Sequence, residues 1–505
     1  MLKIGWSKKD VSTELPVFIP GQFEIRISKG VMDPVILTAL TIDSDGEYVI
    51  FLSCDLVGVN AGVLDAIRDK VKSLNPEIDP TKIVMHVTHA HSTPLVSMED
   101  KTMWGYAEDF DGVDIAGPEQ YRDFFINSAA DAVVESFNSK QEGKIAYGYG
   151  YAVVGHSRRP VYFNDRRKLG TGQANSRIVD GFASLYGSTS LDDFSHFETG
   201  PDHFANFLYT FDKDDKLTGA IANIPCPSQN AAREWTLSSD YWHNVRCLLK
   251  EKYGDIYLLP QCAPAGDMAP EILHYFKAQD RRLRLKYPDF KFDERTIRPK
   301  HMIFRQEIAE RICAAFDDVY SWASKEKISE APLMHTVKTV KLQKRLISEE
   351  DFELNMNMYA KHKEESQYKT DGTPEENMKH NALINATNSR YEGVIKRYEE
   401  QKENPLHEME LHVIRLGDIA FATNQYELFI DYMHRIQGRS PFTQTFCIQL
   451  VAQPNNTPGG SYLATERAAH NVGYSATMYC NRISPEGGQQ LVEETVKELK
   501  KLYEE

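Results

Sequence analysis

Two histidines, His89 and His91, stand two residues apart directly after a hydrophobic, strand-like segment at residues 82–87. On extended backbone, side chains at positions i and i+2 point to the same side, so both imidazoles can face one point. This arrangement suits a divalent metal, or one metal ligand beside one hydrogen-bond donor. The same spacing also fits two polar loop histidines with ordinary hydrogen bonds, and spacing alone does not separate the two interpretations.

Glu427 is a second candidate, because it lies at the end of a predicted strand among apolar neighbours. A buried carboxylate needs a partner, since an unpaired buried charge is very costly. A metal or an arginine would supply that partner. The alternative is an ordinary ion pair with a basic residue of the following segment, such as Arg435 or Arg439.

Arg158 and Arg159 place two fixed positive charges in one loop. Guanidinium groups bind carboxylate or phosphate through paired hydrogen bonds, so the two arginines could bind an anionic group, or they could form surface ion pairs. His243 follows Asp240 at a predicted helix start. It could be a metal ligand with Asp240 behind it, or a histidine that packs the helix.

The segments around these residues alternate between strand-like and helix-like patterns, which predicts an α/β fold of mixed β-sheets flanked by helices. Three predicted strands run directly into polar loops of the kind that carry sites in α/β sheets. These are residues 82–87 before His89, 217–224 before Gln229, and 256–259 before Asp267. Further predicted strands span residues 35–42, 48–53 and 413–421, and predicted helices span 119–137, 488–503 and the segment from a cap at Asn60 to Leu74.

The composition is that of a globular protein, with 505 residues, 41% hydrophobic and 26% charged, and a formal charge of −15. This excludes a disordered chain, and an acidic surface repels phosphate backbones, so we expect no nucleic-acid partner. No apolar run approaches the roughly 20 residues that span a bilayer, and the N-terminus lacks a signal-peptide pattern, so we expect no membrane insertion and a cytoplasmic location. The seven scattered cysteines form no CxxC pair and indicate reduced thiols.

We expect a single domain over residues 1–505 with helical insertions at about 272–300 and 348–404, because both segments are strongly charged. The second insertion is predicted to break near residues 371–374. The sequence contains no Walker A, GxSxG or HExxH motif and no GxGxxG after a strand. A nucleotide-driven enzyme and an α/β-hydrolase are therefore disfavoured.

Taken together, the motifs resemble the zinc-dependent catalytic domain of the neutral, non-lysosomal ceramidase family. The most specific element is residues 88–94, THAHSTP, which match the family's THTHSxP signature. Arg158 stands in a loop similar to the family's NRSP, and residues 266–270, GDMAP, approximate its GDxSP. Glu427 matches a later strand-end glutamate, and Tyr462 matches a tyrosine near a YxTxxE sequence.

The resemblance implies a ceramidase-like domain that binds Zn²⁺ or another divalent metal. The implied ligands are His89, Glu427 and Tyr462, and the implied pocket residues are His91, Arg158 and Gly21. Two positions depart from the family. Ala269 replaces the nucleophilic serine, and residues 224–229, where the family has a distant zinc histidine, contain none, so His243 or Cys226 is the candidate replacement and we favour His243.

We therefore expect a metal-dependent hydrolase that attacks a small amide-like or sugar-derived substrate with a zinc-bound water. His91 and Arg158 would stabilise the oxyanion, and Arg159 and Gln229 would bind substrate. Asp267 would orient the water, or it could be a turn residue that caps backbone N–H groups.

Two other function classes remain open at this point. One is a carbohydrate-active lyase or glycosidase, in which Tyr462 or a histidine removes a proton from a sugar. The other is a non-catalytic binding protein, since the serine is missing. The expected partner is a small-molecule substrate, and a homo-oligomer stays open.

Overall fold

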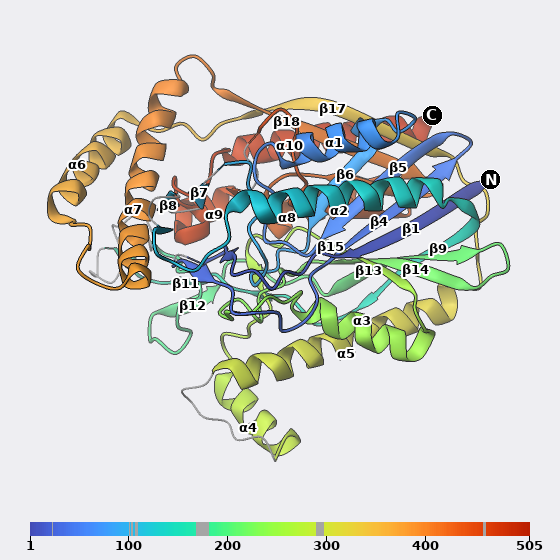
Figure 1. The fold of residues 1–505 in the computed structure, drawn as a ribbon, viewed down its shortest axis with the longest axis horizontal. Helices are drawn as coiled ribbons and strands as arrows, with labels where there is room; N and C mark the ends of the chain where they lie inside the picture. The colour runs from blue at the N-terminus through green and yellow to red at the C-terminus, as the bar shows by residue number, and fades with distance from the viewer. Residues whose placement is uncertain are drawn as a thin grey trace.

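The computed structural model describes residues 1–22, 24–99, 101–102, 105–106, 110–167, 181–288, 297–457 and 461–505. Two β-sheets lie face to face, and helices pack on their outer faces (Figure 1). The predicted mixed α/β class is confirmed. Among the described residues no helix is long and apolar enough to cross a membrane.

The larger sheet has eight strands in the order β15-β14-β13-β9-β1-β4-β5-β6. They are β1 (Leu2–Asp10), β4 (Ile36–Ser44), β5 (Glu47–Cys54), β6 (Ile83–Val87), β9 (Gln141–Tyr151), β13 (Phe204–Asp212), β14 (Leu217–Ile224) and β15 (Tyr257–Cys262). The pairs β5–β6 and β14–β15 are parallel, and the others are antiparallel. Almost every residue of β4 is buried, as expected for a strand covered on both faces.

The smaller sheet has the order β17-β18-β19-β21. Its strands are β17 (Leu333–Gln343), β18 (Leu406–Leu416), β19 (Ile419–Thr423) and β21 (Gln444–Ile448). The prediction of one strand over 413–421 is wrong, because the chain reverses at Gly417 and forms the antiparallel pair β18–β19. Gly417 has φ of 61°, a left-handed conformation that glycine adopts without a steric penalty.

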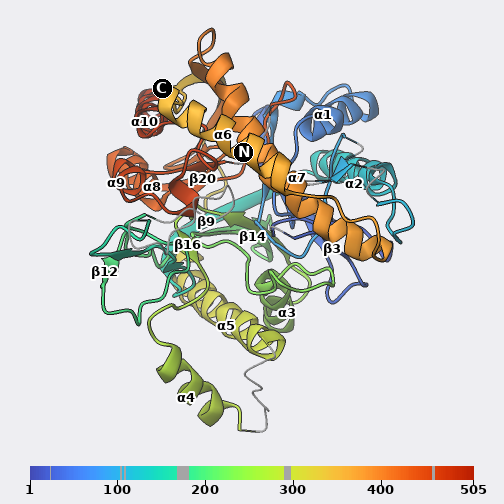
Figure 2. The same ribbon diagram turned by 90° about the vertical axis from the view of Figure 1, so that its left-hand side faces the viewer.

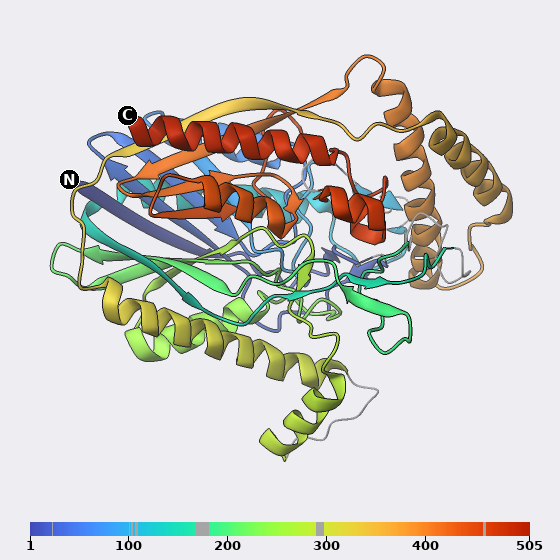
Figure 3. The ribbon, with the colours of Figure 1, turned by 180° about the vertical axis from the view of Figure 1, so that it is seen from behind.

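The buried hydrophobic residues form three layers, one between the two sheets and one between each sheet and its outer helices. Phe51, Phe421 and Phe446 stack between the two sheets, with ring centroids 4.9 Å and 4.7 Å apart. The outer helices are α1 (Val63–Leu74), α2 (Pro118–Asn138), α3 (Tyr241–Tyr253) and α5 (Ile297–Ala323) on the larger sheet, and α8 (Ile430–Arg439) and α10 (Pro485–Glu504) on the smaller one. Figure 3 shows α10 lying along the smaller sheet, with α5 on the opposite side of the molecule.

Three further helices project from this sandwich: α4 (Phe276–Lys286), α6 (Glu349–Glu365) and α7 (Pro374–Glu400). Figure 2 shows α7 lying across one end of the molecule. The predicted break between α6 and α7 is present, and α7 begins with a capping box between Thr373 and Glu376. The short helix α9 (Glu466–Asn471) follows the two-residue strand β22 (Tyr462–Leu463).

Two predicted boundaries are corrected by the structure. The segment 272–300 includes the first turn of α5, whose later residues Ile308 and Phe316 are buried against the larger sheet, and residues 289–296 lie outside the described part of the chain. The predicted cap Asn60 does not precede the first helix directly. Gly62 occupies that position with φ of 80°, and the Asn60 carbonyl accepts a bond from the Val63 N–H.

Short strands fix the loops at the strand ends. They are β2 (Phe18–Ile19), β3 (Arg26–Ile27), β7 (Lys101–Thr102), β8 (Gly105–Tyr106), β10 (His156–Ser157), β11 (Pro160–Tyr162), β12 (Phe194–Phe197), β16 (Met268–Ala269), β20 (Glu427–Leu428) and β22 (Tyr462–Leu463). The larger sheet curls so that its edge strand β15 contacts β5 and β6, and Ser53 donates to the Pro260 carbonyl at 2.6 Å. The loops after β6 and β14 therefore meet, and Ser228 donates to the Thr88 carbonyl at 2.9 Å.

Candidate active site

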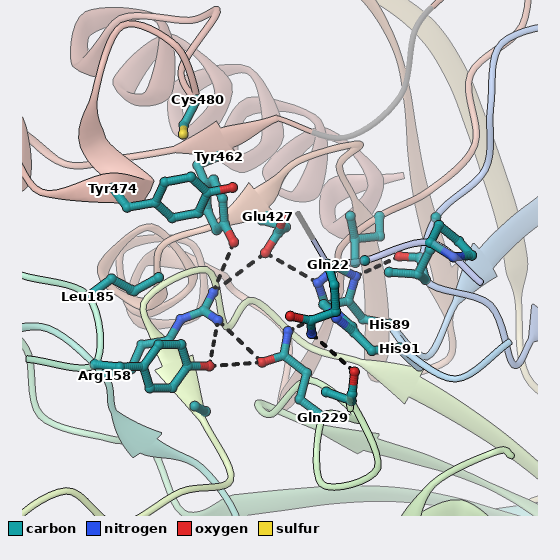
Figure 4. A pocket seen from close by; sticks show the side chains of 18 of the residues that line it. Gln22, His89, His91, Arg158, Leu185, Gln229, Glu427, Tyr462, Tyr474 and Cys480 are labelled. Atoms are coloured by element: carbon teal, nitrogen blue, oxygen red, sulfur yellow. Dashed lines mark hydrogen bonds and ion pairs between the residues drawn. The ribbon is translucent and has the colours of Figure 1, made fainter. Parts of the chain in front are cut away.

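The loops at this end of the sheets enclose a cleft of about 2550 Å³. His89, His91, Arg158, Gln229, Glu427 and Tyr462 all line it, and Figure 4 shows them facing one another. They come from strand ends and loops between residues 89 and 462 of the chain. The two sheets bring these distant segments together.

His89 is held in one orientation and one tautomer. Its φ is 59°, a strained conformation for a residue with a side chain. The ring Nδ1 lies 2.6 Å from the Val57 carbonyl oxygen, which can only accept, so Nδ1 carries a proton and donates. The Nε2 atom then faces a Glu427 carboxylate oxygen at 3.3 Å. A neutral imidazole would place two acceptors against each other there, so a proton or a shared cation must lie between them.

Glu427 and Tyr462 are neighbours because their strands pair. Strands β20 and β22 run parallel with Glu427 opposite Tyr462, so both side chains leave the same face. Burial opposes ionisation of Glu427, but the charges of His89 and Arg158 and hydrogen bonds to the carboxylate hold its pKa below the ordinary value. Burial, and then the Glu427 charge, raise the pKa of Tyr462 well above its ordinary value. The site therefore contains an ionised carboxylate and a protonated phenol.

Arg158 fixes the other side of the site. Its guanidinium donates to the Tyr186 and Tyr462 hydroxyls at 3.2 Å and 3.3 Å and to the Gly266 carbonyl at 2.9 Å. It also lies 3.5 Å from a Glu427 oxygen. Burial opposes the charge of Arg158, but these oxygen atoms raise its pKa above the ordinary value. Arg158 is a permanent cation that faces the carboxylate.

His91 and Gln229 complete a chain of polar contacts. The Gln229 amide oxygen accepts from Arg158 at 3.3 Å, and its amide nitrogen lies 2.8 Å from Nε2 of His91. Burial, then the neighbouring positive groups, hold the pKa of His91 well below its ordinary value, so the ring is neutral and accepts from the amide. A Cβ at Gly21 would come within 2.7 Å of His91 Nδ1. Glycine is therefore required beside this ring.

Asp267 and Arg159 lie behind the cleft rather than in it. Asp267 accepts from the Ile430 N–H at 3.0 Å, and its carbonyl oxygen accepts from the Arg158 N–H at 3.1 Å. This matches the alternative of a turn carboxylate that binds backbone N–H groups. Arg159 points away from Arg158, because consecutive residues of an extended segment point to opposite sides. There it forms a buried ion pair with Glu198. Neither side chain is among the described residues that line the cleft, so the structure does not bring them to the predicted catalytic or substrate-binding positions.

His243 and Cys226 are also not brought to the site. His243 lies on α3, and its Nε2 atom is 3.5 Å from Sγ of Cys247, one turn further along the helix. Cys247 is exposed, so the His243 side chain points toward the surface and not into the cleft. Cys226 is buried, and its carbonyl accepts from the Tyr241 hydroxyl. Neither is found among the described lining residues.

The spacing of His89 and Glu427 matches that of two ligands of one divalent metal. Two ligands held about 2.0–2.1 Å from one tetrahedral zinc ion lie roughly 3.3 Å apart. The separation of His89 Nε2 and Glu427 Oε2 is 3.3 Å, and the Val57 contact turns a lone pair toward this point. The described residues contain no group of three His, Cys, Asp or Glu ligands, so the Tyr462 phenol is the available third donor. The set fits a cation with an open coordination position.

Tyr186 is a site residue that the sequence did not reveal. Its hydroxyl donates to Gln229 at 3.1 Å and accepts from Arg158, which links the two. The surrounding sequence, Ala-Ser-Leu-Tyr-Gly-Ser at 183–188, carries no recognisable motif. Its role depends on tertiary placement alone.

Comparison of the whole structure with solved structures decides the fold. The neutral ceramidase from Pseudomonas aeruginosa superposes with a TM-score of 0.67 at 14% identity, covering 100% of this chain and 74% of that chain. The chain has the neutral ceramidase fold. A structure described as ceramidase complexed with C2 matches with a TM-score of 0.64 at 12% identity, covering 100% and 75% of the two chains.

The resemblance drawn from the short motifs is thus confirmed at the level of the ceramidase fold. No family profile matches the sequence. No curated protein sequence matches it either. The ceramidase likeness therefore rests on the arrangement of the backbone and on the few motif residues that meet in the cleft.

Proposed function

We propose that this protein is a metal-dependent hydrolase that cleaves an amide-like or similarly polarised bond of a small substrate. The observation that carries the proposal is the pairing of His89 and Glu427. The Val57 carbonyl fixes the His89 tautomer, so Nε2, which lies 3.3 Å from an ionised carboxylate oxygen, is the ring atom that can bind a cation shared with Glu427. Ligand pairs of this kind hold zinc in hydrolases, and the ceramidase fold supports the same class.

His89, Glu427 and Tyr462 would hold the cation. When bound, zinc lowers the pKa of a bound water to about 7 and so supplies hydroxide at neutral pH. This chemistry matters here because Ala269 lines the cleft where the family's serine would stand, and a methyl group offers no nucleophile.

Arg158 is the group that would bind the developing oxyanion. It is charged at all accessible pH values, and three of its acceptors belong to the fixed residues Gly266, Gln229 and Tyr186. Such a preorganised donor stabilises negative charge in a dry site without reorganisation. His91 acts on the same side by holding the Gln229 amide, which in turn orients Arg158.

Tyr462 is the candidate proton donor for the leaving group. Burial keeps its phenol protonated, and the hydroxyl lies 3.3 Å from Arg158 beside Glu427. In the form in which it does not ligate the cation, this protonated hydroxyl can donate a proton to a departing amine or alcohol; as a ligand it would leave that step to water. The same residue would remove a proton in the lyase alternative, so the product formed separates the two reactions.

The test is a turnover assay with a panel of N-acyl amides and uronic-acid oligosaccharides, before and after metal removal by a chelator. We expect release of amine from an N-acyl substrate, loss of turnover on chelation, and recovery with Zn²⁺. His89→Ala should abolish turnover, and His243→Ala should leave it intact. Full turnover in chelator would contradict the proposal. An ultraviolet-absorbing unsaturated product from the oligosaccharide alone would favour the lyase.

A further inference from the structure

The wall of the cleft formed by α7 and its neighbours carries an excess of positive charge. This α7 wall consists of Lys344, Arg345, Arg390, Lys396, Arg397, Glu400, His407 and Arg482, all of which line the cleft. Six of these eight residues are lysine or arginine, in a chain with a formal charge of −15. Glu400 is the one carboxylate among the described residues of this wall, and it lies 3.5 Å from Lys396.

The inner arginines of this wall are positioned by backbone carbonyls. Arg397 donates to the carbonyls of Met478 at 2.6 Å and Asn481 at 3.0 Å, and to that of Arg345 at 3.2 Å. Arg345 donates to the Ala476 carbonyl at 2.8 Å. Within the described part of the chain neither makes an ion pair with a carboxylate. Their charges are therefore held in place but are not neutralised.

Arg482 is the most available cation of the α7 wall. It is exposed, it lines the cleft, and its guanidinium makes no hydrogen bond or ion pair with any described residue. It lies close to the inner arginines, because the Arg345 N–H donates to the Arg482 carbonyl at 2.9 Å. The neighbouring chain also reaches the catalytic centre, since the Tyr462 N–H donates to the Cys480 carbonyl at 3.0 Å.

Burial and the crowding of positive charge both lower pKa values in this wall. Burial, followed by the charges of Arg482 and Arg345, lowers the pKa of Arg397 to about 10. Burial, followed by Arg482 and Lys344, lowers the pKa of His407 to about 4. An anion placed among these groups would relieve the repulsion between them.

The opposite side of the cleft is different. There, on α4 and α5, Arg282 pairs with Glu307 at 2.7 Å and Lys300 pairs with Asp280 at 3.0 Å. All four residues also line the cleft. These two cations are each paired with a carboxylate, whereas Arg311 on the same side donates to the Val153 carbonyl. The larger excess of positive charge is on the α7 wall, with six cations and one carboxylate.

We propose that the α7 wall is a subsite for an anionic group of the substrate, bound by Arg482, Arg397 and Arg345. The group is a carboxylate, sulfate or phosphate, because guanidinium forks bind these oxyanions through paired charge-assisted hydrogen bonds. This inference rests on the proposed function in one respect: the substrate would place its anion on the α7 wall and its scissile bond at His89 and Glu427. The substrate class is thus a small acidic compound with a hydrolysable bond.

Anion binding can be measured without any turnover. Inorganic sulfate, inorganic phosphate and glucuronate would be titrated into the whole protein by calorimetry at low ionic strength, and the tightest ligand would assign the chemistry. Arg482→Gln should weaken binding at least about tenfold, and Arg482→Glu should abolish it. Arg282→Gln on the α5 side is the matched control and should leave the affinity within about twofold. Melting temperatures would verify that each variant is folded.

The proposal is overturned if none of the three anions binds to the wild-type protein, or if Arg282→Gln weakens binding as much as Arg482→Gln. His89→Ala should keep full anion affinity, so failure of the metal-hydrolase proposal and failure of the subsite are separate results. Once a substrate is found, Arg482→Gln should raise KM about tenfold for the acidic substrate with little change in kcat. An unchanged KM would contradict the substrate placement.

Discussion

Arg158 and Arg159 are consecutive, both almost fully buried, and used in opposite ways. They lie between β10 and β11 with 2% and 0% exposure. Arg159 is closed by Glu198 through bonds of 2.6 Å and 3.2 Å, with further donation to Ser475 at 2.9 Å. Arg158 makes one short bond of 2.9 Å, to the Gly266 carbonyl, and spreads its other contacts of 3.2–3.5 Å over hydroxyl, amide and carboxylate oxygens that line the cleft.

The difference shows how a buried charge is recognised as structural or functional. The bidentate pair with Glu198, together with bonds to Ser475 and to the Val472 carbonyl, engages all three guanidinium nitrogens of Arg159 and leaves little for a ligand. Arg158 keeps long, replaceable contacts around a cavity, so it can shift part of its donation to a substrate oxygen. Burial and charge are the same in both cases, and partner geometry separates them.

The largest expected effect belongs to Arg159→Ala. Removing this partner leaves Glu198 buried and unpaired, so we expect the free energy of unfolding to fall by about 3–5 kcal/mol. Urea denaturation measures it. A loss below about 1 kcal/mol would mean that the pair is open to water and would remove the contrast between the two arginines.

Arg158→Ala should lower kcat/KM by about 10²–10³ while costing much less stability than Arg159→Ala. Arg158→Lys should not restore the rate, because an ammonium cannot reproduce the guanidinium fork. Steady-state kinetics and melting temperatures on the same preparations measure both quantities. Equal loss of stability in the two alanine variants, with activity kept in the folded fraction, would contradict the assignment.

The free energy of unfolding should depend on pH through the buried carboxyl group of Asp267. Burial raises its pKa from 3.8 to about 6. A carboxyl whose folded pKa is raised binds its proton more tightly in the folded state, so the contribution of Asp267 to stability is greatest below pH 4 and falls as pH rises toward 6. The shift corresponds to on the order of 3 kcal/mol. Asp267→Asn, which keeps the acceptor for Ile430 N–H, should remove this slope between pH 4 and 6 in denaturation curves. An unchanged slope would assign it to another group.

The smallest expected effect is that of Tyr186→Phe. This change deletes the hydroxyl shared by Arg158 and Gln229 at 3.2 Å and 3.1 Å. One hydrogen bond of about 1 kcal/mol corresponds to roughly a fivefold loss of kcat/KM. Tyr121→Phe is the matched control, since its hydroxyl binds the Val11 carbonyl far from the cleft. Equal losses in both variants would remove Tyr186 from the site.

Much of this site could be predicted from sequence because it is built on strand ends. His89, Glu427 and Tyr462 follow or lie on short strands, and the position of a strand end in a sheet limits where its side chains can go. The same reasoning could have shown that Arg158 and Arg159 do not both face the site, since neighbouring side chains on extended backbone point to opposite sides. His243 could not be placed, because a helical pattern near its cap does not tell which face meets the site. Tyr186 had no pattern at all.

The fold was predicted less evenly. Hydrophobic patterns located β4, β5, β6, β14 and β15 of the larger sheet, but β1, β9 and β13 were not predicted. The chain reversal at Gly417 and Asp418 was missed because apolar residues flank this turn on both sides. The pairing of the two sheets depends on contacts between distant segments, such as Phe51 with Phe421, which local patterns do not specify.

The central claim is that His89 and Glu427 hold one cation beside Arg158. Anomalous diffraction at the zinc absorption edge, on crystals of the catalytically active protein, tests it directly. We predict a single peak about 2.0–2.2 Å from both His89 Nε2 and Glu427 Oε2, absent in crystals of His89→Ala. Active crystals with no peak at this point, or with a peak only beside His243 and Cys247, would contradict the account.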